Sequence, residues 1–121
     1  LGLGWRERLV QAQLFTGAEW RAAIAGDTPL ILLGDFNSLR GSRPYRMLSH
    51  HLRDVRDLIP ATKPIRTFPT RFPVLSVDHI FVNTAVQPVR VVVHRSPLAR
   101  IASDHFPLIA ELAPCAHART A

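Results

Sequence analysis

Apolar residues recur at helical spacing in the first part of the chain. Between positions 5 and 15 they return every three or four residues, which places them on one side of a helix. Thr16 is followed three residues later by Glu19, the spacing of a capping box, in which the two side chains satisfy free backbone N–H groups at a helix start. The pattern predicts a helix over 5–15 and a second, shorter helix that begins at Thr16 and ends near Ala25.

Positions 30–33 form a fully apolar run of strand length with turn residues on both sides. A strand that is apolar on both faces is typical of the interior of a sheet, so we predict a buried, central strand here. Further apolar runs predict strands near 77–82, 89–93 and 108–112.

The segments between these strands supply the remaining elements. Ser42 is a suitable N-cap for a helix that begins at about Arg43, and the segment 60–73 is a proline-rich connection. Short strands and helices in this order, without an internal repeat, indicate a compact α+β domain.

Composition limits the class of protein without naming a function. The 121 residues fit one ordinary domain, and 47% hydrophobic residues are enough to build a core. No stretch of about 18 apolar residues is present, so we expect a soluble protein and place it in the cytoplasm. The single cysteine, Cys115, excludes an intramolecular disulfide and a cysteine-rich zinc site.

The net charge of +6 fits a partner that carries phosphate groups, because cations attract and hold phosphates. The basic residues are scattered, however, and all except Lys63 are arginine, a composition that a GC-rich genome also produces. Charge alone therefore does not establish nucleic-acid binding.

Three polar motifs lie at the ends of the predicted strands. The run 34–37 (Gly-Asp-Phe-Asn) follows the first strand, Asp78 opens the second, and the run 103–107 (Ser-Asp-His-Phe-Pro) precedes the last. Each aspartate alone is explained as a turn, a strand edge or a helix cap. A carboxylate at the edge of a core is costly unless it is paired, and three such residues together indicate a common partner, for which a divalent cation and a histidine would serve.

In this order and spacing the three motifs resemble those of the endonuclease/exonuclease/phosphatase superfamily, which includes deoxyribonuclease I and exonuclease III. The resemblance runs from the helix before the first motif to Leu112. It implies the C-terminal half of a four-layered α/β sandwich, with mostly antiparallel sheet and helices on its outer face. It also implies hydrolysis of phosphodiester or phosphomonoester bonds with Mg²⁺ or Mn²⁺.

The resemblance assigns a role to five residues. Asp35 orients or deprotonates the attacking water, and Asn37 bonds a phosphoryl oxygen or the Asp35 side chain. Asp104 helps to bind the metal ion, His105 contacts the scissile phosphate, and Asp78 holds the far nitrogen of the His105 ring. Both Asp35 and the pair of Asp78 and His105 satisfy the proton bookkeeping of a general base, so that choice stays open.

The resemblance also implies a metal-binding glutamate from the first half of the domain. Glu7, Glu19 and Glu111 are the only glutamates, and none has a matching context. We therefore expect this chain to be inactive alone and to act as part of a longer chain. The alternative is an inert binding or interaction module that keeps the scaffold residues.

The implied sandwich leaves one face of the strand at 30–33 without a cover. We expect the chain to pair through that face with a copy of itself or with the missing N-terminal half. The substrate stays open among nucleic acid, a phospholipid head group and a sugar phosphate.

Other polar residues carry weaker signals. A serine-hydrolase triad of Ser103, Asp104 and His105 is excluded, because three consecutive residues cannot adopt triad geometry. We expect His79 to be satisfied in the core or turned to solvent, and the pair His50 and His51 to be a solvated helix end.

Overall fold

The computed structural model describes residues 1–59, 65–71, 73 and 75–115. Within them the chain forms a mixed α+β fold of short helices and antiparallel strands, which confirms the predicted fold class. The elements, in chain order, are α1 (Trp5–Phe15), α2 (Ala18–Ala25), β1 (Ile31–Asp35), α3 (Arg43–Ser49), β2 (Arg53–Asp54), α4 (Val55–Leu58), β3 (Asp78–Val82), β4 (Val86–Val93), α5 (Pro97–Ala102) and β5 (Leu108–Pro114).

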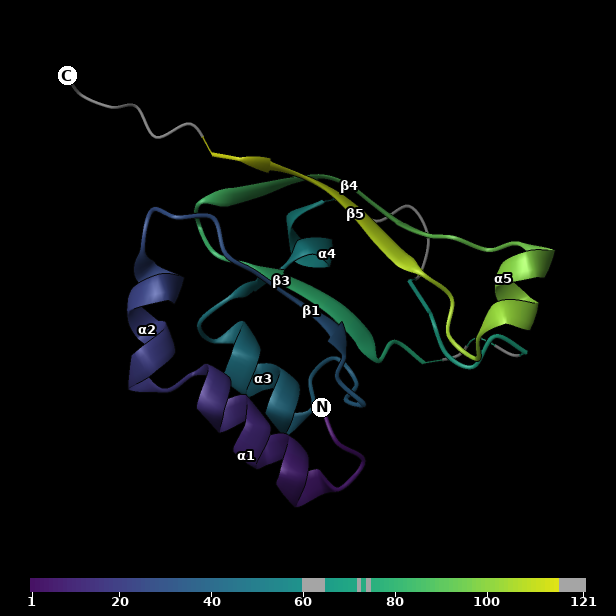
Figure 1. The fold of residues 1–121 in the computed structure, drawn as a ribbon, viewed down its shortest axis with the longest axis horizontal. Coiled ribbons are helices and arrows are strands. Elements are labelled where there is room, and N and C mark those ends of the chain that lie inside the picture. The colour runs from purple at the N-terminus through teal and green to yellow at the C-terminus, as the bar shows by residue number, and fades with distance from the viewer. Residues whose placement is uncertain (60–64, 72, 74, 116–121) are drawn as a thin grey trace.

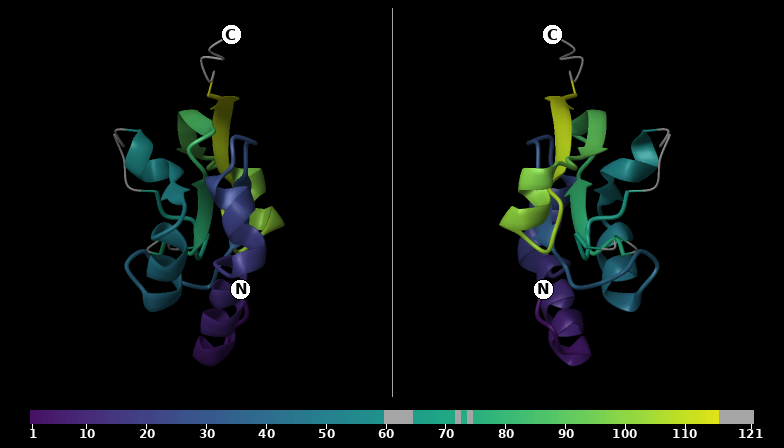
Figure 2. Two further views of the ribbon diagram at one scale, coloured as in Figure 1. Left: turned by 90° about the vertical axis from the view of Figure 1, so that its left-hand side faces the viewer. Right: turned by 90° about the vertical axis from the view of Figure 1, so that its right-hand side faces the viewer.

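The described strands form two antiparallel sheets. One has the order β1-β3-β2, and the other is the pair β4-β5, with an irregularity in its register between Pro88 and Arg90. Helices α1 and α3 lie against one face of the first sheet, and β4-β5 lies on its other side (Figure 1). The side views show the same order, from the helices at one end to the strands β4 and β5 at the other (Figure 2).

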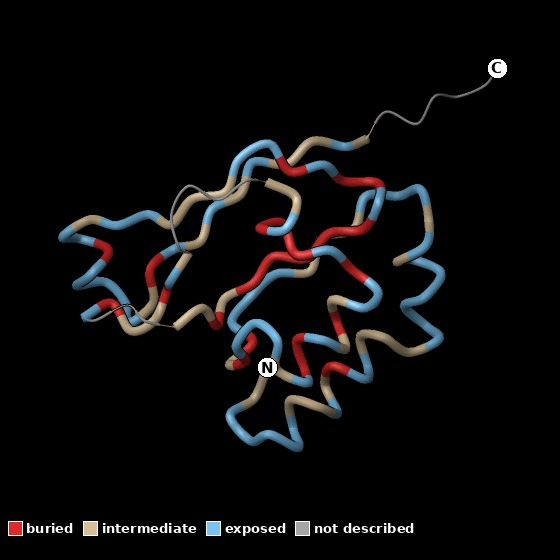
Figure 3. Tube along the Cα trace, turned by 180° about the vertical axis from the view of Figure 1, so that it is seen from behind, coloured by how far each residue is buried: buried red, intermediate tan, exposed pale blue. Residues whose placement is uncertain are grey.

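Alternation along the central strand β3 builds two cores, because successive side chains point to opposite faces of a sheet. Phe81 packs with the residues of α1 and α3, while Ile80 and Val82 pack toward β4 and β5. The buried segments of the chain meet around this strand (Figure 3). Strand β3 is therefore fixed from both sides, and it can hold a polar group in a constant position at its end.

Strand β1 is not the central strand that its apolar run predicts. Among the described strands it lies at the edge of its sheet, and β3 is central. Leu32 packs against the core of α1 and α3, but Ile31 and Leu33 are 45% and 63% exposed on the other face. The run is apolar on both faces as predicted, and this part of the chain covers only one of them.

The predicted capping box at Thr16 is wrong. Helix α2 begins at Ala18 with Gly17 as its N-cap, and no side chain bonds its free N–H groups. The Thr16 hydroxyl instead donates to the carbonyls of Ala12 and Gln13, so it closes the end of α1. The spacing is that of a capping box, but the hydroxyl has found the last carbonyls of the preceding helix.

The other predicted elements are present, with small shifts of their ends. Helix α3 begins at Arg43 with Ser42 in the N-cap position, although the Ser42 side chain makes no capping bond. Strand β2 and the short helices α4 and α5 were not predicted. Part of the predicted connection over 60–73 lies outside the described residues. Among the described residues, no helix combines the length and the apolar character needed to cross a membrane.

Candidate functional site

Pairing of β1 with β3 brings the first two motifs together. The antiparallel register sets Asp35 directly opposite Asp78, at the end of both strands. Gly34 precedes Asp35 with a φ of 152°, a backbone conformation that side chains other than hydrogen rarely adopt. The glycine of the motif is thus explained by this backbone conformation inside β1, one residue before the strand ends.

The loop after β1 holds the Asp35 carboxylate in place. Asn37 adopts a positive φ of 47°, and its backbone N–H donates to Asp35 Oδ1 at 2.8 Å. Its side-chain amide donates to the carbonyl of Leu1 at 2.6 Å. Asn37 therefore bonds the Asp35 side chain through its backbone N–H. Its side-chain amide, for which the resemblance implied a bond to a phosphoryl oxygen or to Asp35, contacts Leu1 here.

His105 completes the cluster from the loop between α5 and β5. Its Nδ1 atom lies 2.8 Å from Asp78 Oδ2, as expected, and its Nε2 atom lies 3.5 Å from Asp35 Oδ2. The ring packs on Phe68, with centroids 4.6 Å apart and an angle of 38° between the planes. Three segments that are distant in sequence therefore converge on one imidazole.

The segment around Thr67 connects Asp78 to the loop that carries His105. The Thr67 hydroxyl donates to Asp78 Oδ2, and the Thr67 carbonyl accepts from the N–H of Phe106 at 2.8 Å. Thr70 continues the link, because its N–H donates to the carbonyl of Asp104 at 2.9 Å. The sequence analysis assigned no role to Thr67, since a threonine in a proline-rich segment carries no signal of burial, yet it is fully buried here.

The environment of His105 favours its protonated form. Burial alone would lower the pKa of the imidazole, but the hydrogen bond and charge of Asp78, with the charges of Asp35 and Asp104, raise the pKa above its ordinary value of 6.5. An imidazolium donates from both ring nitrogens. With Nδ1–H bonded to Asp78, the Nε2 atom lies near the carboxylates of Asp35 and Asp104.

The oxygen donors of the cluster suit a hard divalent cation. One ligand atom each from Asp35, Asp78 and His105 lies within 4.8 Å of the others, and no other such group occurs among the described residues. His105 Nδ1 is already bonded to Asp78 Oδ2, and oxygen ligands suit Mg²⁺ or Mn²⁺ better than an imidazolium, so the carboxylates are the ligands to expect. Asp104 adds a third carboxylate, 3.9 Å from His105 Nε2 and with its side chain 76% exposed.

An open pocket of about 350 Å³ lies over the cluster. Asp35, Asp78 and His105 line it together with Leu33 of β1 and with residues of the segment from Ser103 to Leu108. It is large enough for a phosphate group with part of its ester. Carboxylates, an imidazolium and a shallow opening are what attack on a phosphorus centre requires.

The fold and this site can now be compared with known proteins. The model of the Endonuclease/Exonuclease/phosphatase family matches residues 3–105. The chain belongs to this family. The match includes the first two motifs and the third as far as His105, so the resemblance drawn from those motifs is confirmed.

Proteins similar to this chain are longer than it. YbhP of Escherichia coli (strain K12) is 36% identical over 112 residues, which cover 91% of this chain and 43% of YbhP. The mannosyl-6-phosphatase Bt3783 of Bacteroides thetaiotaomicron VPI-5482 superposes with a TM-score of 0.71 at 27% identity, over 92% of this chain and 47% of Bt3783. A conserved protein of Enterococcus faecalis V583 gives a TM-score of 0.73 at 29% identity, over 93% and 46% of the two chains. The chain thus spans a little under half the length of each of these proteins.

The remaining polar residues from the sequence analysis lie away from the cluster. His79 is buried to 1% exposure on the opposite face of β3, in agreement with a satisfied core histidine. His50 and His51 are exposed at the end of α3, as expected. The three glutamates are exposed, and none belongs to the candidate metal group among the described residues.

Proposed function

We propose that this chain is the C-terminal half of a phosphate-ester hydrolase that works with a divalent metal ion. The observation that carries the proposal is the contact of His105 with Asp78 on one side and with Asp35 on the other, within a member of the Endonuclease/Exonuclease/phosphatase family. Fold alone does not choose a reaction, so the proposal rests on this site.

In the proposed reaction, water attacks phosphorus and the leaving oxygen departs on the opposite side. His105 donates Nε2–H to a phosphoryl oxygen and stabilises the charge that grows there, while Asp78 fixes the ring. Asp35 is the general base, because an imidazolium with a raised pKa has no free lone pair to accept a proton. The side-chain amide of Asn37 is a second donor for the phosphate once it leaves its contact with Leu1.

Mg²⁺ or Mn²⁺ suits the oxygen donors of the site, and we propose that Asp104 and Asp35 help to hold it. The ion, when bound, neutralises phosphate charge as a Lewis acid. No glutamate belongs to the cluster among the described residues, so we propose that the metal-binding glutamate implied by the resemblance comes from the preceding half of the domain.

A phosphate monoester of a small molecule is the substrate class we favour. The mannosyl-6-phosphatase Bt3783 has a matching fold, and the pocket of about 350 Å³ suits a phosphorylated sugar. The net charge of +6 fits any anionic ester, including a nucleic acid, so a nuclease is the competing outcome of the test.

One face of β1 is apolar and exposed, and we propose that the preceding half of the domain packs against it. Ile31 and Leu33 form an apolar surface on the inner side of the sheet, and the chain spans only 43% of YbhP and 47% of Bt3783. A strand added beside β1 would extend the sheet at its edge. A second layer packed on the face that carries Ile31 and Leu33 would bury both residues. A second copy of this chain could cover the same surface but would supply no metal-binding glutamate.

Hydrolysis by a longer chain, extended at its N-terminus to the length of its relatives, tests the proposal. It is expected to hydrolyse p-nitrophenyl phosphate or a sugar 6-phosphate with Mg²⁺ or Mn²⁺ and to stop with a chelator. His105→Ala should lower kcat by roughly a hundredfold to a thousandfold, the cost of losing one charge-stabilising donor. A preference for bis(p-nitrophenyl) phosphate or DNA would shift the substrate class. Activity that is indifferent to both the chelator and His105→Ala would reject the mechanism.

A further inference from the structure

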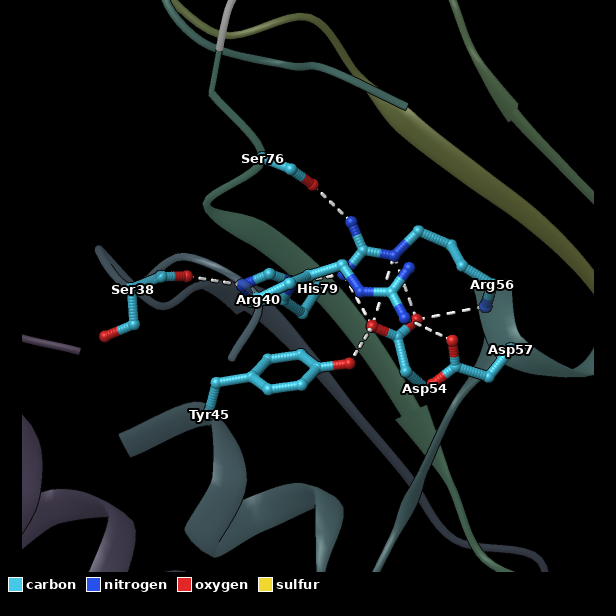
Figure 4. Close-up of polar contacts among 8 residues, drawn as sticks. All are labelled: Ser38, Arg40, Tyr45, Asp54, Arg56, Asp57, Ser76 and His79. Carbon is cyan, nitrogen blue, oxygen red and sulfur yellow. Dashed lines mark hydrogen bonds and ion pairs between the residues drawn. The ribbon is translucent and has the colours of Figure 1, made fainter. Parts of the chain in front are cut away.

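His79 follows Asp78 in the sequence but lies on the other face of β3. Its ring is buried to 1% exposure and packs between aromatic rings, with centroids 5.0 Å from Tyr45 and 5.6 Å from Phe36. A histidine in an aromatic core is costly unless both of its ring nitrogens have partners. Both do, and the partners belong to other segments of the chain (Figure 4).

The two partners fix which nitrogen of His79 carries the proton. Nε2 lies 2.5 Å from the carbonyl oxygen of Ser38, which can only accept a hydrogen bond. Nδ1 faces Nη2 of Arg56, and a guanidinium can only donate. His79 is therefore neutral, with its proton on Nε2 directed at the backbone of Ser38.

Arg56 is itself held by a buried ion pair. Its Nε atom donates to Asp54 Oδ1 at 2.9 Å, its Nη2 atom also reaches Oδ2, and the two side chains are 3% and 0% exposed. The Tyr45 hydroxyl donates to Asp54 as well, at 2.8 Å. Burial would raise the pKa of Asp54, but the bonds and charge of Arg56 lower it, so the carboxylate stays ionised.

This group of Asp54, Arg56 and His79, here called the buried triad, touches both segments that carry the site. Ser38 follows Asn37 directly in the loop that holds Asp35, and His79 bonds its carbonyl. Arg56 Nη1 also donates to the hydroxyl of Ser76, two positions before Asp78 (Figure 4). The buried triad therefore links the loop that follows Asp35 to the segment that leads into Asp78.

We propose that His79 is a positioning residue for the hydrolysis proposed above. Its Nε2–H bond to Ser38 fixes the left-handed turn at Asn37, and the Asn37 N–H in turn orients the Asp35 carboxylate. Asp54 and Arg56 hold the ring in the orientation that this bond needs. The expected effect on the rate rests on the proposed function, whereas the hydrogen bonds of His79 and Asn37 do not depend on it.

A purely structural role is a weaker explanation of the triad. A buried ion pair adds little net stability compared with apolar residues of the same volume, since removing two charges from water offsets their attraction. The bonds that leave the triad go to a backbone carbonyl beside Asn37 and to a side chain beside Asp78, which are points where small displacements reach the reacting groups. A displacement of about 1 Å at such points can lower a rate a hundredfold.

Two substitutions separate the bond to Ser38 from packing. In His79→Gln the longer amide reaches the Ser38 carbonyl, while His79→Asn is one methylene shorter and falls short of it. Both keep a polar group that can accept from Arg56, so neither leaves an unpaired guanidinium as an apolar residue would. The matched control is His51→Asn, which removes an exposed imidazole at the end of α3.

The first measurement uses the 121-residue chain and needs no activity. Two-bond ¹⁵N–¹H correlations of the imidazole rings should show His79 as the neutral Nε2–H form near neutral pH. The Asn37 backbone amide should keep its chemical shift in His79→Gln and move in His79→Asn. A proton on Nδ1, or an Asn37 amide unaffected by either change, would overturn the proposed geometry.

The second measurement uses the longer chain with p-nitrophenyl phosphate and Mg²⁺. His79→Asn should lower kcat roughly tenfold to a hundredfold with KM changed less than about twofold, whereas His79→Gln should stay within about threefold of the unaltered protein. Equal kcat for both variants and the His51→Asn control, in folded protein, would overturn the positioning role. An unaltered longer chain without activity would instead reject the proposed function, and the imidazole and amide spectra would still decide where His79 directs its proton.

Discussion

His105 Nδ1 lies 2.8 Å from Asp78 Oδ2, although 27 positions separate the two residues. The contact forms where β3 begins, close to the loop before β5, and the Thr67 hydroxyl donates to the same carboxylate oxygen. Asp78 is therefore the fixed point of the site, and His105 takes its orientation from it.

Replacing Asp78 by asparagine should lower the pKa of His105. The substitution removes the negative charge and the ionised acceptor that raise this pKa, while the effect of burial, which lowers it, remains. The ring-proton shifts of His105, followed by NMR across the pH range in metal-free protein, measure the change. Asp57→Asn, which alters an exposed carboxylate paired with Arg40, is the control and should leave the titration unchanged. A titration of His105 that is the same in Asp78→Asn and Asp57→Asn would contradict the assignment.

Acidification should weaken the fold in a window set by His79. Burial and the charge of Arg56 lower the pKa of His79 from 6.5 to about 4. Between these values the unfolded chain binds a proton that the folded chain does not, so the free energy of unfolding should fall with decreasing pH. The total loss should reach at most about 3 kcal/mol.

Urea unfolding at a series of pH values tests this window. His79→Gln should flatten the pH dependence between about 6.5 and 4, and His51→Gln should leave it intact. Asp54, whose pKa is lowered, loses its stabilising effect only as the pH falls below its ordinary value of 3.8, so it acts at the acid edge of the window. A slope that persists unchanged in His79→Gln would show that another group binds the proton.

Gly34→Ala should destabilise the chain by about 1–3 kcal/mol, the usual cost of holding a non-glycine residue in such a conformation. The cause is the backbone φ of 152°, since a Cβ at this position would meet no atom within 4 Å. Gly4→Ala, at a helix N-cap with a φ of −73°, is the matched control: it carries no strain in φ, and its cost should stay below about 1 kcal/mol. Equal midpoints of urea unfolding for the two variants would mean that the turn before Asp35 relaxes without strain.

Much of the architecture follows from local sequence. The strands β1, β3 and β5 are apolar runs bounded by turn residues, and this contrast is enough to place them within a few residues. The site is predictable for the same reason, because its aspartates come directly at the ends of these runs. The contact of His105 with Asp78, however, is predicted by the family resemblance and not by the apolar pattern. The structure gives its distance.

The rest depends on contacts between distant segments. An apolar run predicts a strand but not the strands with which it pairs, so the edge position of β1 could not be predicted from it. Strand β2 and helix α4 span two and four residues, too few for a periodic pattern to emerge. The bond of Arg56 to His79 joins residues 23 positions apart, and nothing in either local sequence marks an arginine that is 6% exposed.

The central claim is that Asp35, Asp78 and His105 form a phosphoesterase site, and paired substitutions in the longer chain test it most directly. Hydrolysis of p-nitrophenyl phosphate with Mg²⁺ should be measured for Asp35→Asn and for Asp57→Asn. The second variant is the matched control, because it makes the same substitution at another exposed aspartate. The account predicts that Asp35→Asn lowers kcat by roughly a hundredfold or more, as expected for loss of a general base, and that Asp57→Asn leaves it unchanged. Equal activity of the two variants, at a rate that also survives a chelator, would contradict the account.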